Sequence, residues 1–214
     1  MSAATTKLPL TYLELTKLAG NKLVRFPATF EAYWELLAKA EYRADFYQDE
    51  IITMSYENEH HSDIVSEFSY LLKTIYPGKN RNFKVHNANR PIYIGNFSSE
   101  HSVFNPDGSV VAQPAKHYEY SPGMNAESTP VLLFEVLSKS TRSYDFGTKL
   151  PLYKQISTLN TIIYIETKKV SVLVMERESK NRWVETEYSQ KDDFFLIKES
   201  PIYLKDIYLD WIEA

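Results

Sequence analysis

The chain has 214 residues, a formal net charge of −4 and no cysteine, which excludes disulfides, thiolate metal sites and thiol nucleophiles. This length favours one large domain with its own hydrophobic core, and the net charge excludes a polycation that coats nucleic acid. The N-terminus lacks the features of a signal peptide and no apolar run approaches membrane-spanning length, so a soluble cytoplasmic protein without a membrane partner is expected.

The first part of the chain is predicted to contain short helices, a hairpin and one long helix. Helices are expected in LTYLELTKLA and in TFEAYWELLAKA, with Thr29 as the N-cap of the second. ADFY, the turn QDE and IITMSY form a hairpin pattern. The clearest helix is EHHSDIVSEFSYLLKTI, whose apolar residues repeat at helical spacing. Residues 1–28 are interpreted as a helical extension and 29–214 as the main domain.

The rest of the chain is predicted to be mostly β. Two polar segments, 96–105 and 114–130, are expected to be loops, and a helix is expected before residue 157, with Pro151 limiting where it begins. The chain should end in a helical turn. The sum is an α/β (α+β) domain, a mixed sheet with helices on its faces. The predicted strands are NFKVHN, RPIYI, DGSVVAQ, VLLFEVL, TIIYIE, VSVLVMER, RWVETEY and DFFLI.

One carboxylate interrupts the apolar strand PVLLFEVLS at Glu135, where an unpaired charge would be expensive. Alternation puts Val131, Leu133, Glu135 and Leu137 on one face, and Leu132, Phe134 and Val136 on the other. The carboxylate is therefore delivered near the end of the strand, where open α/β sheets place their sites.

Asp107, Glu135 and Lys149 form a constellation that fits metal-dependent chemistry. Two carboxylates at the ends of neighbouring strands can converge on one Mg²⁺ or Mn²⁺ ion. Such an ion polarises a phosphodiester and lowers the pKa of the attacking water. A nearby lysine can orient that water or offset charge on phosphorus.

These residues lie in a pattern that resembles the Uma-type restriction endonucleases of bacteria, within the PD-(D/E)XK nuclease superfamily. FNPDGSVVA and LLFEVLSKSTRSYDFGTKLPLYKQI are similar to the family's two core motifs, ADFYQDEIITMS to its hairpin and EHHSDIV to a helix opening. The resemblance runs from about residue 29 to the C-terminus. It implies a restriction-endonuclease-like fold, with metal ligands at Asp107 and Glu135 and with Lys149, Asp145 and Tyr153 on further motif positions. It also places the family histidine on His61, and it matches Asp45 and Glu50 to two glutamates of the family hairpin.

The sequence departs from the family pattern at three positions. A standard motif would have lysine where Leu137 stands, so Lys149 from the following helix is the candidate and only the backbone carbonyl of Leu137 remains as a ligand. Gly108 replaces an apolar residue and is expected to loosen its strand. Asp49 stands where the hairpin glycine is expected, which aspartate tolerates.

Each candidate has a structural alternative. Asp107 caps a turn in the simplest reading, and Glu135 forms a structural salt bridge. Lys149 pairs with Asp145 if both lie on one helix, whereas Pro151 in the first turn would leave Asp145 in a loop. In the corresponding alternatives, His61 lies on the surface without a role in the site, and Tyr153 only contributes to packing. Asp45 and Glu50 either join an acidic cluster or are solvated, and Glu50 has the better match.

A basic stretch runs from Lys73 to Arg90 without an acidic residue. In it we expect Lys79, Arg81, Lys84 and Arg90 to contact phosphates if the substrate is nucleic acid; otherwise these cations only aid solubility.

The leading hypothesis is a Mg²⁺- or Mn²⁺-dependent endonuclease that hydrolyses DNA, with Asp107, Glu135, Lys149 and His61 as catalytic candidates and Glu50 as a further metal ligand. By analogy with nucleases that cut both strands, a homodimer is expected. The alternatives are a non-catalytic binding or structural protein that retains the fold, and a metal-dependent hydrolase of RNA or a small phosphate ester.

Overall fold

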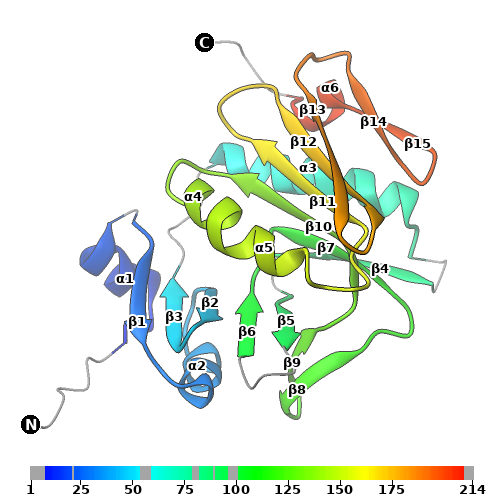
Figure 1. The fold of residues 1–214 in the computed structure, drawn as a ribbon. Helices are drawn as coiled ribbons and strands as arrows, with labels where there is room; N and C mark the ends of the chain where they lie inside the picture. The colour runs from blue at the N-terminus through cyan, green and yellow to red at the C-terminus, as the bar shows by residue number, and fades with distance from the viewer. Residues whose placement is uncertain are drawn as a thin grey trace, which may run out of the picture.

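The computed structural model describes residues 8–20, 22–53, 59–78, 82–88, 90–95 and 101–209. It is a mixed α+β fold in which two sheets meet around one helical segment (Figure 1). The helices are α1 (Tyr12–Ala19), α2 (Phe30–Leu37), α3 (Glu59–Ile75), α4 (Arg142–Tyr144), the π-helical turn η1 (Asp145–Lys149), α5 (Leu150–Tyr153) and α6 (Leu204–Ile207).

A six-stranded sheet in the order β13-β12-β11-β10-β7-β4 forms the centre of the molecule. Its neighbouring strands are antiparallel except β10 and β11, which are parallel because the segment α4-η1-α5 crosses over between them. The bounds are β4 (Phe83–Asn87), β7 (Gly108–Ala112), β10 (Pro130–Leu137), β11 (Thr161–Glu166), β12 (Val172–Ser179) and β13 (Arg182–Tyr188).

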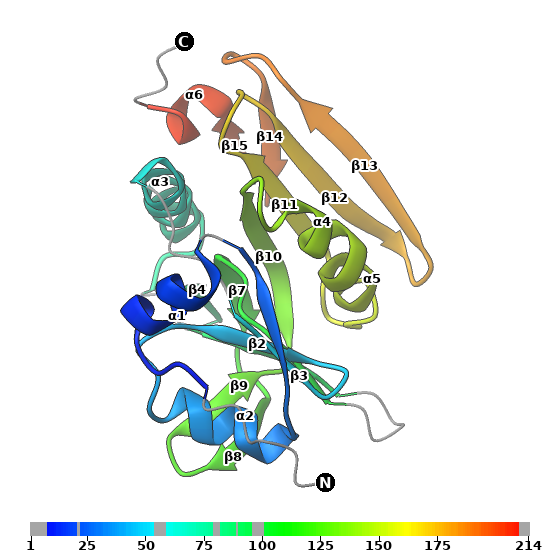
Figure 2. The same cartoon turned by 90° about the vertical axis from the view of Figure 1, so that its left-hand side faces the viewer.

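Helices cover both faces of this sheet (Figure 2). On one face α3 packs against Leu132, Phe134 and Val136, and on the other α4-η1-α5 packs against Leu133 and Leu137. The predicted alternation along β10 is therefore confirmed for residues 132–137. Val131 departs from it and packs with the α3 face, because the pairing of β10 with β7 shifts register between Pro130 and Leu132.

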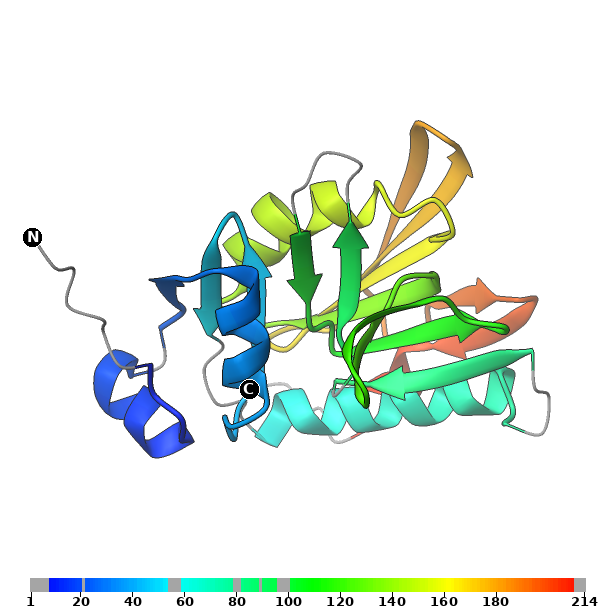
Figure 3. The same cartoon turned by 90° about the horizontal axis from the view of Figure 1, so that it is seen from below.

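A seven-stranded sheet in the order β1-β3-β2-β6-β5-β9-β8 lies beside the first (Figure 3). One face packs on α1 and α2, and the other contributes Ile52 and Phe104 to the cluster around α5. The buried side of the segment α4-η1-α5 thus packs against both sheets. The bounds are β1 (Val24–Pro27), β2 (Ala44–Tyr47), β3 (Glu50–Thr53), β5 (Ile92–Gly95), β6 (His101–Phe104), β8 (His117–Ser121) and β9 (Met124–Glu127); β14 (Phe194–Ile197) and β15 (Ser200–Tyr203) form a separate hairpin.

Local chemistry fixes the predicted helices and hairpin. Thr29 accepts a hydrogen bond from the N–H of Ala32 at 3.2 Å, so its predicted role as N-cap is confirmed. Helix α3 has the bounds that its apolar spacing predicts. Gln48 and Asp49 join β2 to β3 with φ of 50° and 55°, the two-residue turn that suits a twisted hairpin, and aspartate tolerates it without glycine.

The structure corrects several element predictions. Both segments expected to be loops contain strands, β6 in the first and β8 and β9 in the second, since short polar strands with tyrosines lack the apolar signal used to find strands. Residues 96–100 of the first segment lie outside the described residues. The predicted extension includes α1 and also β1, which pairs with β3. The final helical turn is present as α6.

The helix before β11 begins at Arg142, well before Pro151, so the expectation that Asp145 lies in a loop is wrong. The N–H of Leu150 bonds to the carbonyl of Asp145, five residues back, and Pro151 follows with no N–H to offer. The wide turn therefore absorbs the proline inside one continuous helix.

Gly108 does not loosen β7. The strand pairs on both sides, with Gly108 opposite Asn87 of β4 and Phe134 of β10. A Cβ at this position would lie 2.1 Å from Cε1 of Phe134. Glycine is required here because an aromatic ring occupies the space of a side chain.

In the part of the chain that the structure describes, no helix has the length and apolar character needed to cross a bilayer.

Candidate active site

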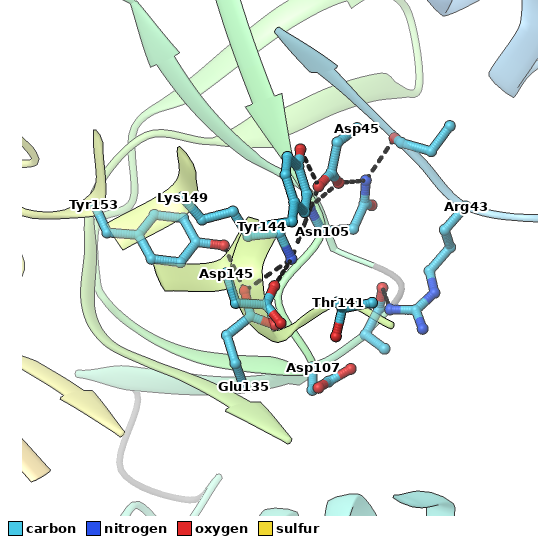
Figure 4. A network of polar contacts seen from close by, with 12 residues as sticks. Arg43, Asp45, Asn105, Asp107, Glu135, Thr141, Tyr144, Asp145, Lys149 and Tyr153 are labelled. Carbon is cyan, nitrogen blue, oxygen red and sulfur yellow. Dashed lines mark hydrogen bonds and ion pairs between the residues drawn. The ribbon is translucent and has the colours of Figure 1, made fainter. Parts of the chain in front are cut away.

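Glu135 lies near the end of β10 on the face covered by α5, and it is 3% exposed. Its Oε1 accepts a hydrogen bond from the Tyr153 hydroxyl at 2.7 Å and lies 3.0 Å from Nζ of Lys149. The charge that interrupts the apolar strand is therefore compensated from the helix packed above it (Figure 4). Tyr153 does more than pack, because its hydroxyl holds the carboxylate.

Lys149 points into the same buried cluster from η1 and is 2% exposed. Its ammonium lies 3.0 Å from Glu135, 3.1 Å from Asp145 and 3.8 Å from Asp45. The pair with Asp145 is the i, i+4 helical pair that the sequence offered as an alternative, and it coexists with the pair to Glu135. Burial alone would lower the pKa of Lys149, but these neighbouring carboxylates raise it well above its usual value, so the lysine is cationic at neutral pH.

Asp107 immediately precedes β7, and its carboxylate lies beside β10. Its Oδ2 accepts a hydrogen bond from the backbone N–H of Val136 at 2.7 Å. Since strand N–H groups point along the sheet, the carboxylate lies in the plane of the sheet, next to the residue that follows Glu135. The structure thus brings the two predicted metal ligands to one place at the end of β10.

His61 approaches Asp107 from the first turn of α3, with Nε2 3.2 Å from Oδ2. It is buried, unlike its neighbour His60, which is exposed. Burial alone would raise the pKa of Asp107, but the hydrogen bond and charge of His61, the charge of Arg43 and the Val136 N–H lower it below its usual value. Asp107 is therefore held ionised.

The pKa of Glu135 is shifted in the opposite direction from that of Asp107. Burial and the charges of Asp145 and Asp107 raise its pKa to about 8, against the opposing effects of Lys149 and Tyr153. Burial of the carboxylate is the largest cause of this shift. Two carboxylates placed side by side therefore differ strongly in proton affinity.

Asp45 is a member of the cluster that sequence reasoning underrated. It was expected to be either a solvated hairpin carboxylate or a minor member, yet it is completely buried. Asn105 and Tyr144 also join the cluster by bonding to it. The sequence signals for Asp45 were its match to an acidic residue of the family hairpin and its position between Ala44 and Phe46, which are both buried as well. Arg43 was likewise not predicted; it donates to the carbonyl of Ala88 at 3.0 Å and lies near Asp107 and Thr141 (Figure 4).

The donor set suits a hard divalent cation. Asp107 and Glu135 supply carboxylate oxygens, and burial is the main cause of the raised pKa of Glu135, a cost that a bound cation would offset. Within the described ranges, no group of three or more His, Asp or Glu side chains is arranged to hold a metal by itself. Mg²⁺ fits this limit because it binds through one or two carboxylates and retains waters or substrate oxygens for the remaining positions.

The two other predicted metal ligands, Glu50 and the carbonyl of Leu137, are engaged in other interactions. Glu50 forms an ion pair with Arg25 at 2.8 Å and is one-third exposed, so the structure does not bring it into the Glu135–Lys149 cluster. The carbonyl of Leu137 accepts a hydrogen bond from the Thr167 hydroxyl at 2.8 Å, which occupies one of its two lone pairs.

The predicted phosphate-contacting residues divide into three cases. Lys79 and Arg81 lie outside the described residues. Lys84 is exposed on β4, three residues along the strand from the level of Gly108, a distance of about 10 Å. Arg90 instead bonds to the buried Glu127 at 2.8 Å, so it joins β9 to the chain before β5.

A cavity of about 880 Å³ lies at the C-terminal end of α3, away from His61, and is lined by Lys73, Tyr76, Phe83 and Lys84 among others. It is separate from the carboxylate cluster, because α3 extends about 18 Å from His61 to Lys73.

Comparisons with known proteins agree with the fold. Residues 30–201 match the model of a family described as Uma2: putative restriction endonuclease. An uncharacterized protein, sll1609, of Synechocystis sp. is 25% identical over 159 residues, which is 74% of this chain and 86% of that protein. The crystal structure of a putative nuclease belonging to DUF820 from Anabaena variabilis has a TM-score of 0.62 and 16% identity, and the likeness covers 83% of this chain and 97% of that one.

Proposed function

The chain belongs to the Uma2 family of putative restriction endonucleases, and from this premise we propose that it is a Mg²⁺- or Mn²⁺-dependent endonuclease that hydrolyses phosphodiester bonds in DNA. The observation that carries the proposal is the buried cluster of Asp107, Glu135 and Lys149 at the end of β10. Neither a turn cap nor an ordinary salt bridge requires two buried carboxylates beside a buried lysine on separate elements.

In this proposal each side chain has a distinct role. Asp107, held ionised by His61 and the Val136 N–H, would bind the metal, with Glu135 as the second ligand. The bound ion would polarise the phosphodiester and lower the pKa of the attacking water. Lys149 remains cationic and would stabilise the charge that develops on the transferred phosphorus. Tyr153 would keep Glu135 oriented as it does here, at 2.7 Å.

The Lys84 side of β4 is the proposed phosphate-contacting surface, and the DNA backbone would run from it toward Asp107. This assignment is supported by the exposure of Lys84 and by the pairing of β4 with β7 in the register that leads to Asp107. Arg90 is given a structural role instead, since its guanidinium is engaged with Glu127.

The proposal is tested by incubating purified protein with supercoiled DNA, linear DNA and RNA, each with Mg²⁺, Mn²⁺ or EDTA. The variants Asp107→Asn, Glu135→Gln and Lys149→Met should each lose at least about 100-fold in cleavage rate. Asp192→Asn and Lys205→Met remove members of an exposed ion pair at 3.4 Å and should cut as the wild type does.

Each outcome decides something different. Metal-dependent cutting of DNA that is lost in all three variants supports the proposal. Cutting that persists in both carboxylate variants would overturn the site, and cutting of RNA alone would overturn the substrate. If no nucleic acid is cut, the chain is a non-catalytic protein that retains the fold.

We also propose a homodimer, since two sites related by two-fold symmetry would let one assembly cut both strands of a duplex. Sedimentation equilibrium should give the mass of two chains, and a strictly monomeric protein at micromolar concentration would contradict this.

A further inference from the structure

We infer that Asp45 is a positioning residue for the reaction: it fixes both Lys149 and the turn that carries Asp107 in a single geometry. This inference rests on the proposed function for its catalytic meaning, but the geometry stands by itself. Asp45 comes from β2 in the seven-stranded sheet, whereas Glu135 comes from the six-stranded sheet. The residue therefore links the two sheets at the candidate site.

Donors surround the Asp45 carboxylate on both oxygens. Oδ1 accepts from the backbone N–H of Asn105 at 2.7 Å and from its side-chain amide at 3.0 Å. Oδ2 accepts from the Tyr144 hydroxyl at 3.0 Å and lies 3.8 Å from the Lys149 ammonium. Burial raises the pKa of Asp45 against the effects of Lys149 and of these hydrogen bonds, but every one of these groups donates, so the bonds favour the ionised carboxylate, which only accepts.

The hydrogen bonds of Asp45 hold the turn before β7 in place. Asn105 is held on two sides, by Asp45 and by the carbonyl of Ala44 at 2.7 Å. Pro106 follows with a fixed φ, and Asp107 comes next. Few rotatable bonds separate the Asp45 clamp from Asp107, so the clamp determines where the Asp107 backbone leaves the turn.

Asp45 also fixes the helical segment α4-η1-α5 through Tyr144 and Lys149. Tyr144 precedes the π-helical turn and Lys149 ends it, and Asp45 contacts both. The Lys149 ammonium is thereby placed among carboxylates from three elements: Glu135 of β10, Asp145 of η1 and Asp45 of β2. Three carboxylates from different elements define the position of the ammonium, whereas two would leave the flexible lysine side chain free to swing toward either.

Asp45 itself is not positioned to touch substrate, because it has no exposed surface and both oxygens are occupied. It acts through Lys149 and Asn105, which is why we call it a positioning residue.

The decisive variant is Asp45→Asn, which keeps the shape and removes the charge. The matched control is Asp49→Asn, in the turn of the same hairpin, where φ of 55° suits asparagine. Cleavage of plasmid DNA with Mg²⁺ should fall about 10- to 100-fold in kcat for Asp45→Asn, with KM changed less than about 3-fold because DNA contacts are untouched. Asp49→Asn should match the wild type.

A double-mutant cycle separates positioning from a general structural role. Because part of the effect of Asp45 passes through Lys149, Asp45→Asn should lower the cleavage rate by a smaller factor in the Lys149→Met background than in the wild type, and the loss that remains measures the part that passes through Asn105 and Asp107. Multiplying effects would overturn the inference. Tyr144→Phe, which removes only one bond to Asp45 and keeps its charge, should lower kcat by a smaller factor and serves if Asp45→Asn does not fold.

An activity-independent measurement keeps this test distinct from the proposed function. A buried, paired ammonium exchanges slowly, so Lys149 should give a ¹H–¹⁵N ammonium signal, identified by its loss in Lys149→Met. That signal should shift or broaden in Asp45→Asn and in Tyr144→Phe but not in Asp49→Asn. An unchanged signal would overturn the positioning role even if the enzyme cuts DNA, and a changed signal would support it even if the wild type cuts nothing.

Discussion

The ring of Phe134 lies where a side chain at Gly108 would begin, so that a methyl group there would come within 2.1 Å of Phe134 Cε1 and 3.0 Å of the His86 carbonyl. The residue after the key aspartate is thus glycine for a packing reason. Gly108 gives no ground for regarding the site as degenerate, because the strand that it opens is fully paired.

Gly108→Val, which places an apolar side chain at this position, should lower the free energy of unfolding by about 3 kcal/mol through overpacking. Combining it with Phe134→Leu should recover at least about 1 kcal/mol relative to the sum of the two single changes. Urea unfolding of the three variants measures this, and strict additivity would show that the ring and the glycine are not coupled.

Stability should depend on pH through Glu135. Its folded pKa of about 8 lies above the ordinary value of 4.5, so the folded state binds the extra proton. The resulting stabilisation is complete below pH 4.5 and is lost as the pH rises through 8. As the pH rises from 5 to 8.5, the free energy of unfolding of the metal-free wild type should therefore fall relative to that of Glu135→Gln by an amount on the order of 3 kcal/mol. Denaturant unfolding in EDTA tests this; parallel pH curves for the two proteins would contradict it.

Metal affinity should rise with pH in the same range. Under the proposed function the ion displaces a proton from Glu135, so the affinity for Mn²⁺ should increase up to about tenfold per pH unit below pH 8. Calorimetric titration at pH 6, 7 and 8, in buffers that differ in ionisation enthalpy, reports both the affinity and the proton released. Binding that is independent of pH would show that Glu135 is not a ligand.

Removing the charge of Lys84 should change DNA binding, whereas removing that of Arg90 should change stability. Lys84→Gln should weaken DNA binding and reduce its salt dependence by about one unit of slope, without loss of stability. Arg90→Gln leaves the buried Glu127 without its 2.8 Å partner and should cost about 2 kcal/mol of stability while leaving the salt slope unchanged. Binding isotherms at several salt concentrations and urea unfolding distinguish the two; a reduced salt slope for Arg90→Gln would assign it to the DNA surface.

The elements that the sequence predicted well are those stabilised locally. Helix α3 has an uninterrupted apolar stripe, Thr29 caps the helix that follows it, and the turn at Asp49 is encoded within two residues. Strand β10 was equally clear, because apolar residues on both faces surround the one charge at Glu135. In each case the physical cause lies within a few residues of its effect.

The features that were missed depend on partners far along the chain. Asp45 bonds to Asn105 and Tyr144, which are 60 and 99 residues away, and nothing in ADFY reveals that both will be near. Asp145 entered the helix because a π-helical turn accommodates Pro151, which a rule based on α-helical bonding does not anticipate. The strand β8 has a partly exposed, tyrosine-rich pattern whose pairing with β9 is decided by the tertiary structure.

The hydrogen bond from the Val136 amide to Asp107 Oδ2, at 2.7 Å, gives the candidate site a built-in spectroscopic reporter. An amide proton shared with a carboxylate resonates according to the charge on that carboxylate, since such charge-assisted bonds are short and strong. Protonation of Asp107, its coordination to an ion or its replacement by asparagine would therefore each move one backbone resonance. The state of the site can therefore be followed at that single peak in substrate-free protein.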